Sequence, residues 1–163
     1  MKDEPKGDRK EAVFDFRLGR GREGPKQFLG DFAGILQSDG YVAYEGMGGP
    51  KLVHACCWAH ARRYFFQAEQ LNPGDAAATR IVARINDLFA IDAEARAQEM
   101  DWAGRDKLRQ NRAKPFLEEI KSRVESARSR ALPSSALAKA CHYTLTLWFK
   151  LTRFLEYPGT GTE

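Results

Sequence analysis

Apolar and polar positions divide the chain into a short N-terminal part of mixed type and a longer helical part. In the first part, Phe14, Phe16 and Leu18 alternate with polar positions, and this period of two predicts a half-buried strand. Residues 1–11 are polar, charged and without periodicity, and we expect them to form a disordered leader.

Two further strands are predicted after a short helix. Pro25 suits the first turn of a helix that carries Phe28, Leu29 and Phe32 at helical spacing. The run "GILQSDG" predicts a short strand that ends at Asp39, and a third apolar run follows the glycine-rich turn at residues 46–49. We therefore expect an α/β core over residues 12–60.

The remaining chain has the pattern of helices. Asp75 and Ser135 each precede an apolar periodic run and are expected to cap helices, while Pro115 indicates a helix boundary. One predicted helix carries a broad apolar stripe, formed by Ile81, Ile85, Leu88, Phe89 and Ile91. The expected fold class is α/β plus all-α, with a helical region over residues 61–157 and a tail at residues 158–163.

Composition narrows the functional classes. The chain has 163 residues, of which 43% are hydrophobic and 29% charged, which is typical of one globular domain. It has no apolar run of the roughly 18 residues that a membrane span needs, and no apolar secretion signal. Three cysteines, two of them adjacent, argue against a disulfide scaffold and for a reducing cytoplasm. A net charge of +4 permits a nucleic-acid partner without requiring one.

Two carboxylates deserve consideration as catalytic groups. Asp39 follows a predicted strand, and functional groups gather at the carboxyl ends of strands in open α/β sheets. Aspartate and glycine are also favoured turn residues, so Asp39 alone leaves both interpretations open. Asp15 lies on the same face of the first strand as Arg17, and an exposed ion pair explains it without catalysis.

A Cys-x-x-His pattern raises the question of a metal. Cys57 and His60 stand three residues apart, a spacing at which a thiolate and an imidazole can bind one ion. A structural zinc site needs four ligands, and the other candidates are scattered: His54, Cys56, Cys141 and His142. The alternative is that Cys57 is buried against Trp58 and that His60 makes an ordinary hydrogen bond.

Basic residues could contact DNA phosphates. Arg62 and Arg63 are adjacent on a predicted helix, and arginine suits bidentate phosphate contacts, although most such pairs are simply solvated. Further basic residues are interleaved with acidic ones, which is typical of a charge-laced helix surface. They are Arg105, Lys107, Arg109, Arg112, Lys114, Lys121, Arg123, Arg128 and Arg130.

Four segments together resemble the transposases of the insertion sequence 66 family. They are "FDFRLGRGREGPKQFLGDFAGILQSDGYVAYEG", "KLVHACCWAHARRYFF", "LFAIDAEAR" and "SALAKACHYTLTLWFKLTRFLE", and they span roughly residues 12–157. None of the motifs is specific alone, but "LQSDGY", "CWAHARR" and "ALAKACHYTLTLW" in this order are highly specific.

This resemblance implies a DDE-type catalytic domain with a partial RNase H-like mixed sheet and a helical insertion. Such a domain uses three carboxylates to hold two divalent ions, Mg²⁺ or Mn²⁺, for DNA cleavage and strand transfer. Asp39 matches the second catalytic aspartate and would bind the metal. Cys57 and His60 match the "CWAH" motif, for which a structural or metal-supporting role, including Zn²⁺ binding, is open. Arg62 and Arg63 match the basic pair, expected to contact DNA at transposon ends.

The chain departs from the family pattern at both ends. The first catalytic aspartate belongs to an Asp-Glu-Thr motif, and the final glutamate to an Asn-Asn-led motif; neither motif occurs here. Glu163 has no matching context and is not assigned that role. One aspartate does not organise two magnesium ions, so we expect a truncated transposase domain that is inactive alone.

Other functions remain open beside a catalytic fragment. The chain could be a non-catalytic DNA-binding module, or a module that dimerises or pairs with a full-length transposase. It could also be a pseudogene product. In each case the resemblance places the protein in a bacterial cytoplasm, associated with the nucleoid, and not in a membrane.

Overall fold

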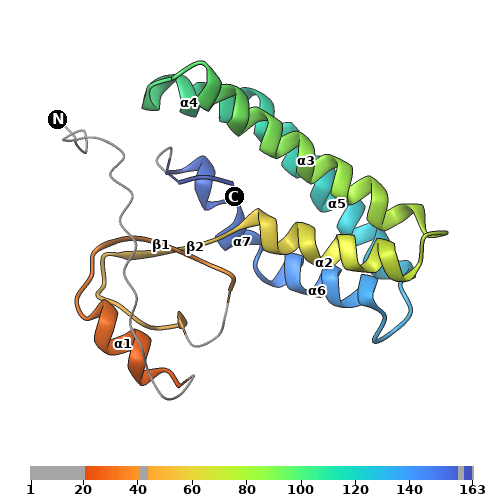
Figure 1. Ribbon diagram of the computed structural model, residues 1–163, viewed down its shortest axis with the longest axis horizontal. Helices are drawn as coiled ribbons and strands as arrows, with labels where there is room; N and C mark the ends of the chain where they lie inside the picture. The colour runs from red at the N-terminus through yellow and green to blue at the C-terminus, as the bar shows by residue number, and fades with distance from the viewer. Residues whose placement is uncertain (1–20, 41–43, 158–159, 163) are drawn as a thin grey trace.

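The computed structural model describes residues 21–40, 44–157 and 160–162. The strand expected at residues 12–18 lies outside these residues, as do Asp15, the expected leader and Glu163. Figure 1 shows two parts: a small sheet with one helix, and an elongated group of helices that continues directly from the second strand.

The N-terminal part contains α1 (Glu23–Leu29), β1 (Gly34–Ser38) and β2 (Leu52–Cys56). Pro25 lies in the first turn of α1, as predicted. The two strands pair in parallel, with Ile35 opposite Val53 and Ser38 opposite Cys56. This confirms a small α/β part, and the described strands pair only in parallel, without the antiparallel pairing of a mixed sheet.

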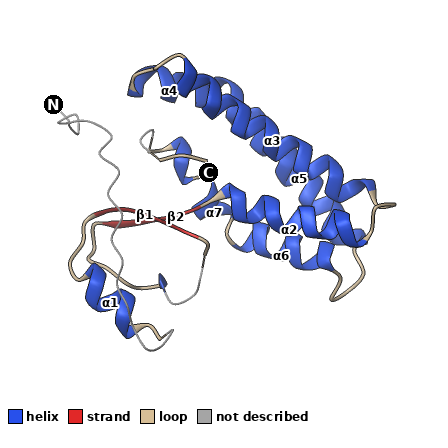
Figure 2. Ribbon diagram, in the orientation of Figure 1, coloured by secondary structure: helices blue, strands red, loops and turns tan. Residues whose placement is uncertain are grey.

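Four long helices form the second part, and each packs against two others in the cyclic order α2, α3, α5, α6 (Figures 1 and 2). They are α2 (Trp58–Leu71), α3 (Ala76–Ala97), α5 (Lys114–Arg130) and α6 (Ala136–Thr146). Shorter elements connect or follow them: α4 (Trp102–Leu108), the π-helical turn η2 (Arg109–Ala113), α7 (Trp148–Leu151) and the 3₁₀ turn η3 (Arg153–Leu155). The predicted helical region is therefore confirmed as a bundle.

Two of the bundle helices, α3 and α6, begin at the caps that the sequence predicts. The Asp75 side chain accepts a hydrogen bond from the Ala77 N–H at 2.9 Å, and that of Ser135 from the Ala138 N–H at 3.1 Å. These side chains satisfy amides that lack partners within their helices. Pro115 lies in the first turn of α5, directly after the π-helical turn η2, so the helix changes type at the predicted boundary and does not end there.

The core lies between the four bundle helices. Ile81, Ile85, Leu88 and Ile91 of the predicted stripe are buried, and Phe89 packs against them partly buried. Trp58 is fully buried at the start of α2, and its Nε1 donates to the Leu151 carbonyl of α7 at 2.9 Å. No helix in the described segments is both long and apolar enough to cross a membrane.

One predicted surface charge is buried instead. Arg109 is 3% exposed, and its Nε and Nη2 donate to Asp92 Oδ1 and Oδ2, both at 3.0 Å. Its remaining donors reach the Phe154 carbonyl at 2.9 Å and the Thr160 carbonyl at 2.7 Å. The expectation of a solvated Arg109 was wrong, because Asp92 and two carbonyls compensate its charge and donors inside the fold.

The same ion pair binds the last described residues. Thr162 is 1% exposed, and its N–H and hydroxyl both donate to Asp92 Oδ2 at 3.0 Å. Its carbonyl accepts from the Trp58 N–H at 2.9 Å, while the Gly161 carbonyl accepts from Gln37 Nε2 at 3.3 Å. Residues 160–162 therefore connect β1, α2 and α3.

Candidate functional site

Asp39 lies at the carboxyl edge of the parallel strand pair. Ser38 is opposite Cys56 in the register, and the Cys57 N–H donates to the Ser38 carbonyl at 3.2 Å. Because both strands end here, Asp39 comes next to the start of α2. This is the edge at which parallel sheets place their functional groups.

The Asp-Gly turn is held against the helical part. Gly40 has φ +79°, and its N–H donates to Ser38 Oγ at 3.2 Å. A Cβ at Gly40 would collide with the Leu147 side chain. Glycine is needed here both for the backbone conformation and for the close approach of Leu147.

An α6 tyrosine contacts the same turn. The Tyr143 hydroxyl donates to the Asp39 carbonyl at 2.5 Å, and the Tyr143 ring lies 4.6 Å from the Tyr64 ring, centroid to centroid. Burial raises the pKa of Tyr143, and the charges of nearby groups, including Asp39, act in the same direction. The hydroxyl therefore stays protonated at neutral pH and remains a donor.

An open cavity of about 570 Å³, here called the Asp39 cavity, extends from this edge. It is lined by Leu36, Gln37, Ser38, Asp39, Tyr44, Cys57 and His60. The structure thus brings three predicted site residues to one place. The Nδ1 atom of His60 is buried and has no hydrogen-bond partner among the described residues, which differs from the ordinary hydrogen bond considered as the alternative.

The described cysteines and histidines do not gather into one cluster of metal-binding side chains. Cys57 is partly exposed, whereas its neighbour Cys56 and the distant Cys141 are buried. Burial raises the pKa of both the Cys56 and the Cys141 thiols to about 11, so both thiols are protonated at neutral pH in the metal-free chain. No three His, Cys, Asp or Glu side chains in the described part of the chain meet as a metal-binding group.

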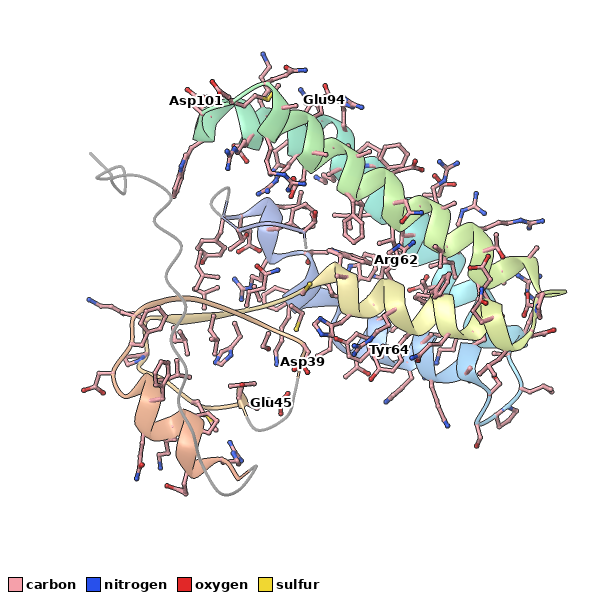
Figure 3. All side chains as sticks on the ribbon, in the orientation of Figure 1. Asp39, Glu45, Arg62, Tyr64, Glu94 and Asp101 are labelled. Carbon is pink, nitrogen blue, oxygen red and sulfur yellow. The ribbon has the colours of Figure 1, made fainter. Side chains whose placement is uncertain are left out.

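The donor set also falls short of a Mg²⁺ centre. Among the described residues, Asp39 supplies the single carboxylate of the Asp39 cavity lining. The nearby Glu45 carboxylate pairs with Lys150 Nζ at 3.3 Å. Figure 3 shows Asp39 well separated from the acidic residues Glu94 and Asp101 at the other side of the molecule. Divalent ions in such sites need several oxygen ligands, and the described residues alone do not provide them.

The two arginines of the predicted DNA contact differ in their surroundings. Arg62 Nε donates to Asn86 Oδ1 at 2.6 Å, and its guanidinium lies 5.7 Å from the Phe66 ring centroid. Arg62 is therefore held against α3. Arg63 is exposed and makes no hydrogen bond or ion pair with the described residues, so its guanidinium is accessible.

Sequence reasoning missed the tyrosines around Asp39. Tyr64 follows the Arg62-Arg63 pair directly, and Tyr44 lies five positions after Asp39 in the sequence. Tyr143 lies on α6, 104 residues away from Asp39. No local period or spacing connects residues that far apart, although Tyr143 does stand inside one of the motifs that carried the family resemblance.

The sequence of the chain is similar to those of known proteins of one family. It matches the family described as Transposase IS66 family over residues 1–161, a longer stretch than the expected 12–157. Two proteins of Sinorhizobium fredii (strain NBRC 101917 / NGR234) are similar: "Uncharacterized protein y4jD", 36% identical over 142 residues, and "Uncharacterized protein y4qI", 32% identical over 152 residues.

These alignments cover 83% and 88% of this chain but 27% and 28% of the two relatives, so the chain spans less than a third of their length. No solved structure matches the chain. The family match over nearly the whole sequence bears out the resemblance that the ordered motifs indicated. The chain belongs to the Transposase IS66 family.

Proposed function

We propose that this chain forms part of a DDE-type, RNase H-like catalytic domain for DNA transposition, with Asp39 as one of its metal-binding carboxylates. The observation that carries this proposal is the place of Asp39: it is exposed, follows a parallel strand, and lines an open cavity beside the start of α2. A carboxylate there is accessible to a divalent ion, and that ion could in turn bind a DNA phosphate.

Asp39 acts together with carboxylates from outside the described residues. Mg²⁺ or Mn²⁺, once held by such a set, would supply charge stabilisation for phosphodiester cleavage and joining. The described residues hold and orient the Asp39 carboxylate: Tyr143 and Gly40 fix the turn through the backbone. With one carboxylate in the Asp39 cavity, we expect neither cleavage nor strand transfer from these residues alone.

Phosphate contacts near this edge come from α2. Arg63 is accessible and its charge suits a DNA backbone phosphate, whereas Arg62 contributes by packing the helix against Asn86. We further propose a bacterial protein of the cytoplasm, associated with the nucleoid, where it would meet its DNA partner. Cys57 and His60 line the Asp39 cavity, and we assign them a supporting role there rather than a zinc site.

The test is a titration with MgCl₂ of the purified chain, mixed with the segments of an intact family member that carry the Asp-Glu-Thr and Asn-Asn-led motifs, followed by NMR of the Asp39 carboxyl group. We expect saturable shifts that Asp39→Asn abolishes. Asp31→Asn is the matched control, because Asp31 is an exposed aspartate just before the opposite end of β1. Equal shifts in both variants, or no shift in a folded chain, would remove Asp39 from the metal site.

A complementation assay tests the catalytic part of the proposal. The segments of an intact family member that carry the Asp-Glu-Thr and Asn-Asn-led motifs are added to this chain, together with DNA carrying transposon ends. Cleavage or joining that depends on Asp39 supports a shared catalytic domain. Mg²⁺-dependent joining by the chain alone would contradict the expected inactivity.

A second candidate is a non-catalytic module that pairs with an intact transposase through its helices. The observation in its favour is that the bundle exposes large apolar side chains at one end, Leu71 at 77% and Leu132 at 76%. Added to an active family transposase, such a module would lower the rate of transposition, and Leu71→Ser with Leu132→Ser would relieve that inhibition. A chain without any effect in either assay fits a pseudogene product.

A further inference from the structure

Three arginines line one cavity. Its lining residues belong to the end of the bundle that Figure 1 shows away from the sheet. Here α3 begins, α5 ends and α6 begins. The cavity has a volume of about 520 Å³, and Arg80, Arg123, Arg130, Ser122 and Ser126 all line it. It is called the arginine cavity below.

Two of these arginines have no carboxylate partner among the described residues. Arg80 is exposed and makes no hydrogen bond or ion pair with the described residues. Arg130 donates only within its own helix, from Nε to the Ser126 carbonyl and from Nη2 to Ser126 Oγ, both at 3.2 Å. Both guanidinium groups therefore keep their full charge and most of their donors.

Acidic groups near the arginine cavity compensate only part of this charge. Arg123 donates to Glu119 Oε1 from Nε at 2.9 Å and from Nη2 at 2.5 Å, so the charge left without a carboxylate partner among the described residues is that of Arg80 and Arg130. Asp75 lines the cavity, and its carboxylate accepts the Ala77 N–H at the start of α3. Three guanidinium groups thus face one lining carboxylate, and an anion would relieve their mutual repulsion.

We infer that the arginine cavity binds a phosphate group, and specifically a backbone phosphate of DNA. Guanidinium groups bind phosphate oxygens in pairs of parallel hydrogen bonds, and the Ser122 and Ser126 hydroxyls add neutral donors. The volume lies within the roughly 300–1,000 Å³ of organic-ligand sites, so a free phosphate ion would leave most of it empty. A phosphodiester with its flanking sugars fits this space better.

The choice of DNA as the source of the phosphate rests on the proposed function. The inference that the arginine cavity binds a phosphate group does not depend on that function. The arginine cavity and Asp39 lie toward opposite ends of the helix pair α2 and α6. A phosphate bound at the bundle end would therefore be a second contact that holds flanking DNA, separate from the phosphate that reacts near Asp39.

Duplex DNA binding measured by fluorescence anisotropy in EDTA tests this inference without any metal at Asp39. Arg80→Gln and Arg130→Gln are each expected to weaken binding about tenfold, because each removes a charge-assisted hydrogen bond. Each should also reduce the slope of log K against log salt by about 0.9, the value for one lost phosphate contact.

Arg128→Gln is the matched control. Arg128 and Arg130 both lie in the last turn of α5 and both are exposed, but Arg128 does not line the arginine cavity. Each substitution removes one charge from the same helix end, so the effects on net charge and on the helix dipole are matched. Equal losses in the Arg128 and Arg130 variants would overturn the inference. If the Arg130→Gln variant does not fold, the Arg80→Gln variant still tests the inference.

A second arm identifies the source of the phosphate. Inorganic phosphate is titrated and followed by the NMR shifts of the Ser122 and Ser126 amides in the chain and in the Arg80→Gln variant. Suppose that phosphate shifts the Ser122 and Ser126 amide signals only when Arg80 is present, while the Arg80→Gln and Arg130→Gln variants bind DNA as well as the unsubstituted chain. That result would support a site for free phosphate and overturn the DNA assignment. No response in either arm overturns the inference. Because EDTA is present in the DNA arm, a failure of metal binding at Asp39 would leave this result unaffected.

Discussion

The hydroxyl of Tyr143 donates a hydrogen bond of 2.5 Å to the backbone carbonyl of Asp39, and so α6 of the bundle holds the turn that ends β1. The position of the candidate catalytic carboxylate therefore depends on a helix 104 residues away in the sequence. The sheet edge and the bundle act as one unit at this point.

Tyr143→Phe should loosen this turn. The change removes one hydrogen bond and leaves the Tyr64 ring contact in place, so we expect a loss of about 1 kcal/mol in unfolding free energy. The NMR signals of Asp39 and Gly40 should shift and broaden, while those of α3 stay unchanged. Tyr157→Phe is the control, since the Tyr157 hydroxyl donates no hydrogen bond to the described residues. Equal effects from both changes would contradict a specific role of Tyr143.

Arg109→Gln should be among the most destabilising changes of a charged residue. It leaves Asp92 buried without its cation and frees the carbonyls of Phe154 and Thr160, with an expected cost of about 3–5 kcal/mol. Urea denaturation followed by circular dichroism measures this loss.

Arg112→Gln is its control within the same π-helical turn. Arg112 pairs with Glu94 at 2.5 Å, but the two side chains are 49% and 35% exposed, so the pair should contribute less than about 1 kcal/mol. Similar urea midpoints for the two variants would mean that the buried network does not hold residues 160–162 as the structure indicates.

Gly40→Ala should destabilise the Asp39 turn by about 1–3 kcal/mol, because φ +79° is strained for alanine and the new Cβ meets Leu147. Gly74→Ala, also in a loop, has no such φ and meets only Asn72 Oδ1 at 3.9 Å. Thermal unfolding of both variants compares the sites. If the Gly74 variant loses as much stability, the requirement for glycine at position 40 is not specific.

Cysteine alkylation should follow burial. Cys57 is partly exposed and should react first with iodoacetamide at pH 8, whereas Cys56 and Cys141, with pKa values of about 11, should stay protected in the native state. Mass spectrometry of the labelled peptides measures the alkylation of each cysteine. After unfolding in urea, all three cysteines should react equally. Native labelling of Cys141 at the rate of Cys57 would contradict its burial.

The same thiols predict how stability depends on pH. Their pKa values are higher in the folded state than the ordinary thiol value, so the folded state favours the protonated form. This contribution is complete below the unfolded thiol pKa and is lost as pH rises through about 11. As the pH rises toward about 11, the urea midpoint of the unsubstituted chain should therefore decrease more than that of the Cys141→Ala variant. An equal decrease in both proteins would contradict the contribution of Cys141.

Local patterns in the sequence determined the elements and their ends. The apolar stripe of α3, the caps at Asp75 and Ser135, and the strand that ends before Asp39 all follow from interactions within a few residues. Helix caps, apolar periodicity and turn preferences depend on residues that are close together in the sequence, so the sequence alone is enough to predict them. The ordered motifs likewise identified the family.

Only the tertiary structure decided which of these residues meet. Arg109 looked like one of many surface charges, and its burial depends on Asp92 and on carbonyls from two later turns. Cys57, His60 and Asp39 line one cavity only because β1 and β2 run in parallel register. Such contacts join positions far apart in the chain. They arise from packing and from the need to pair buried charges and donors, which no local pattern encodes.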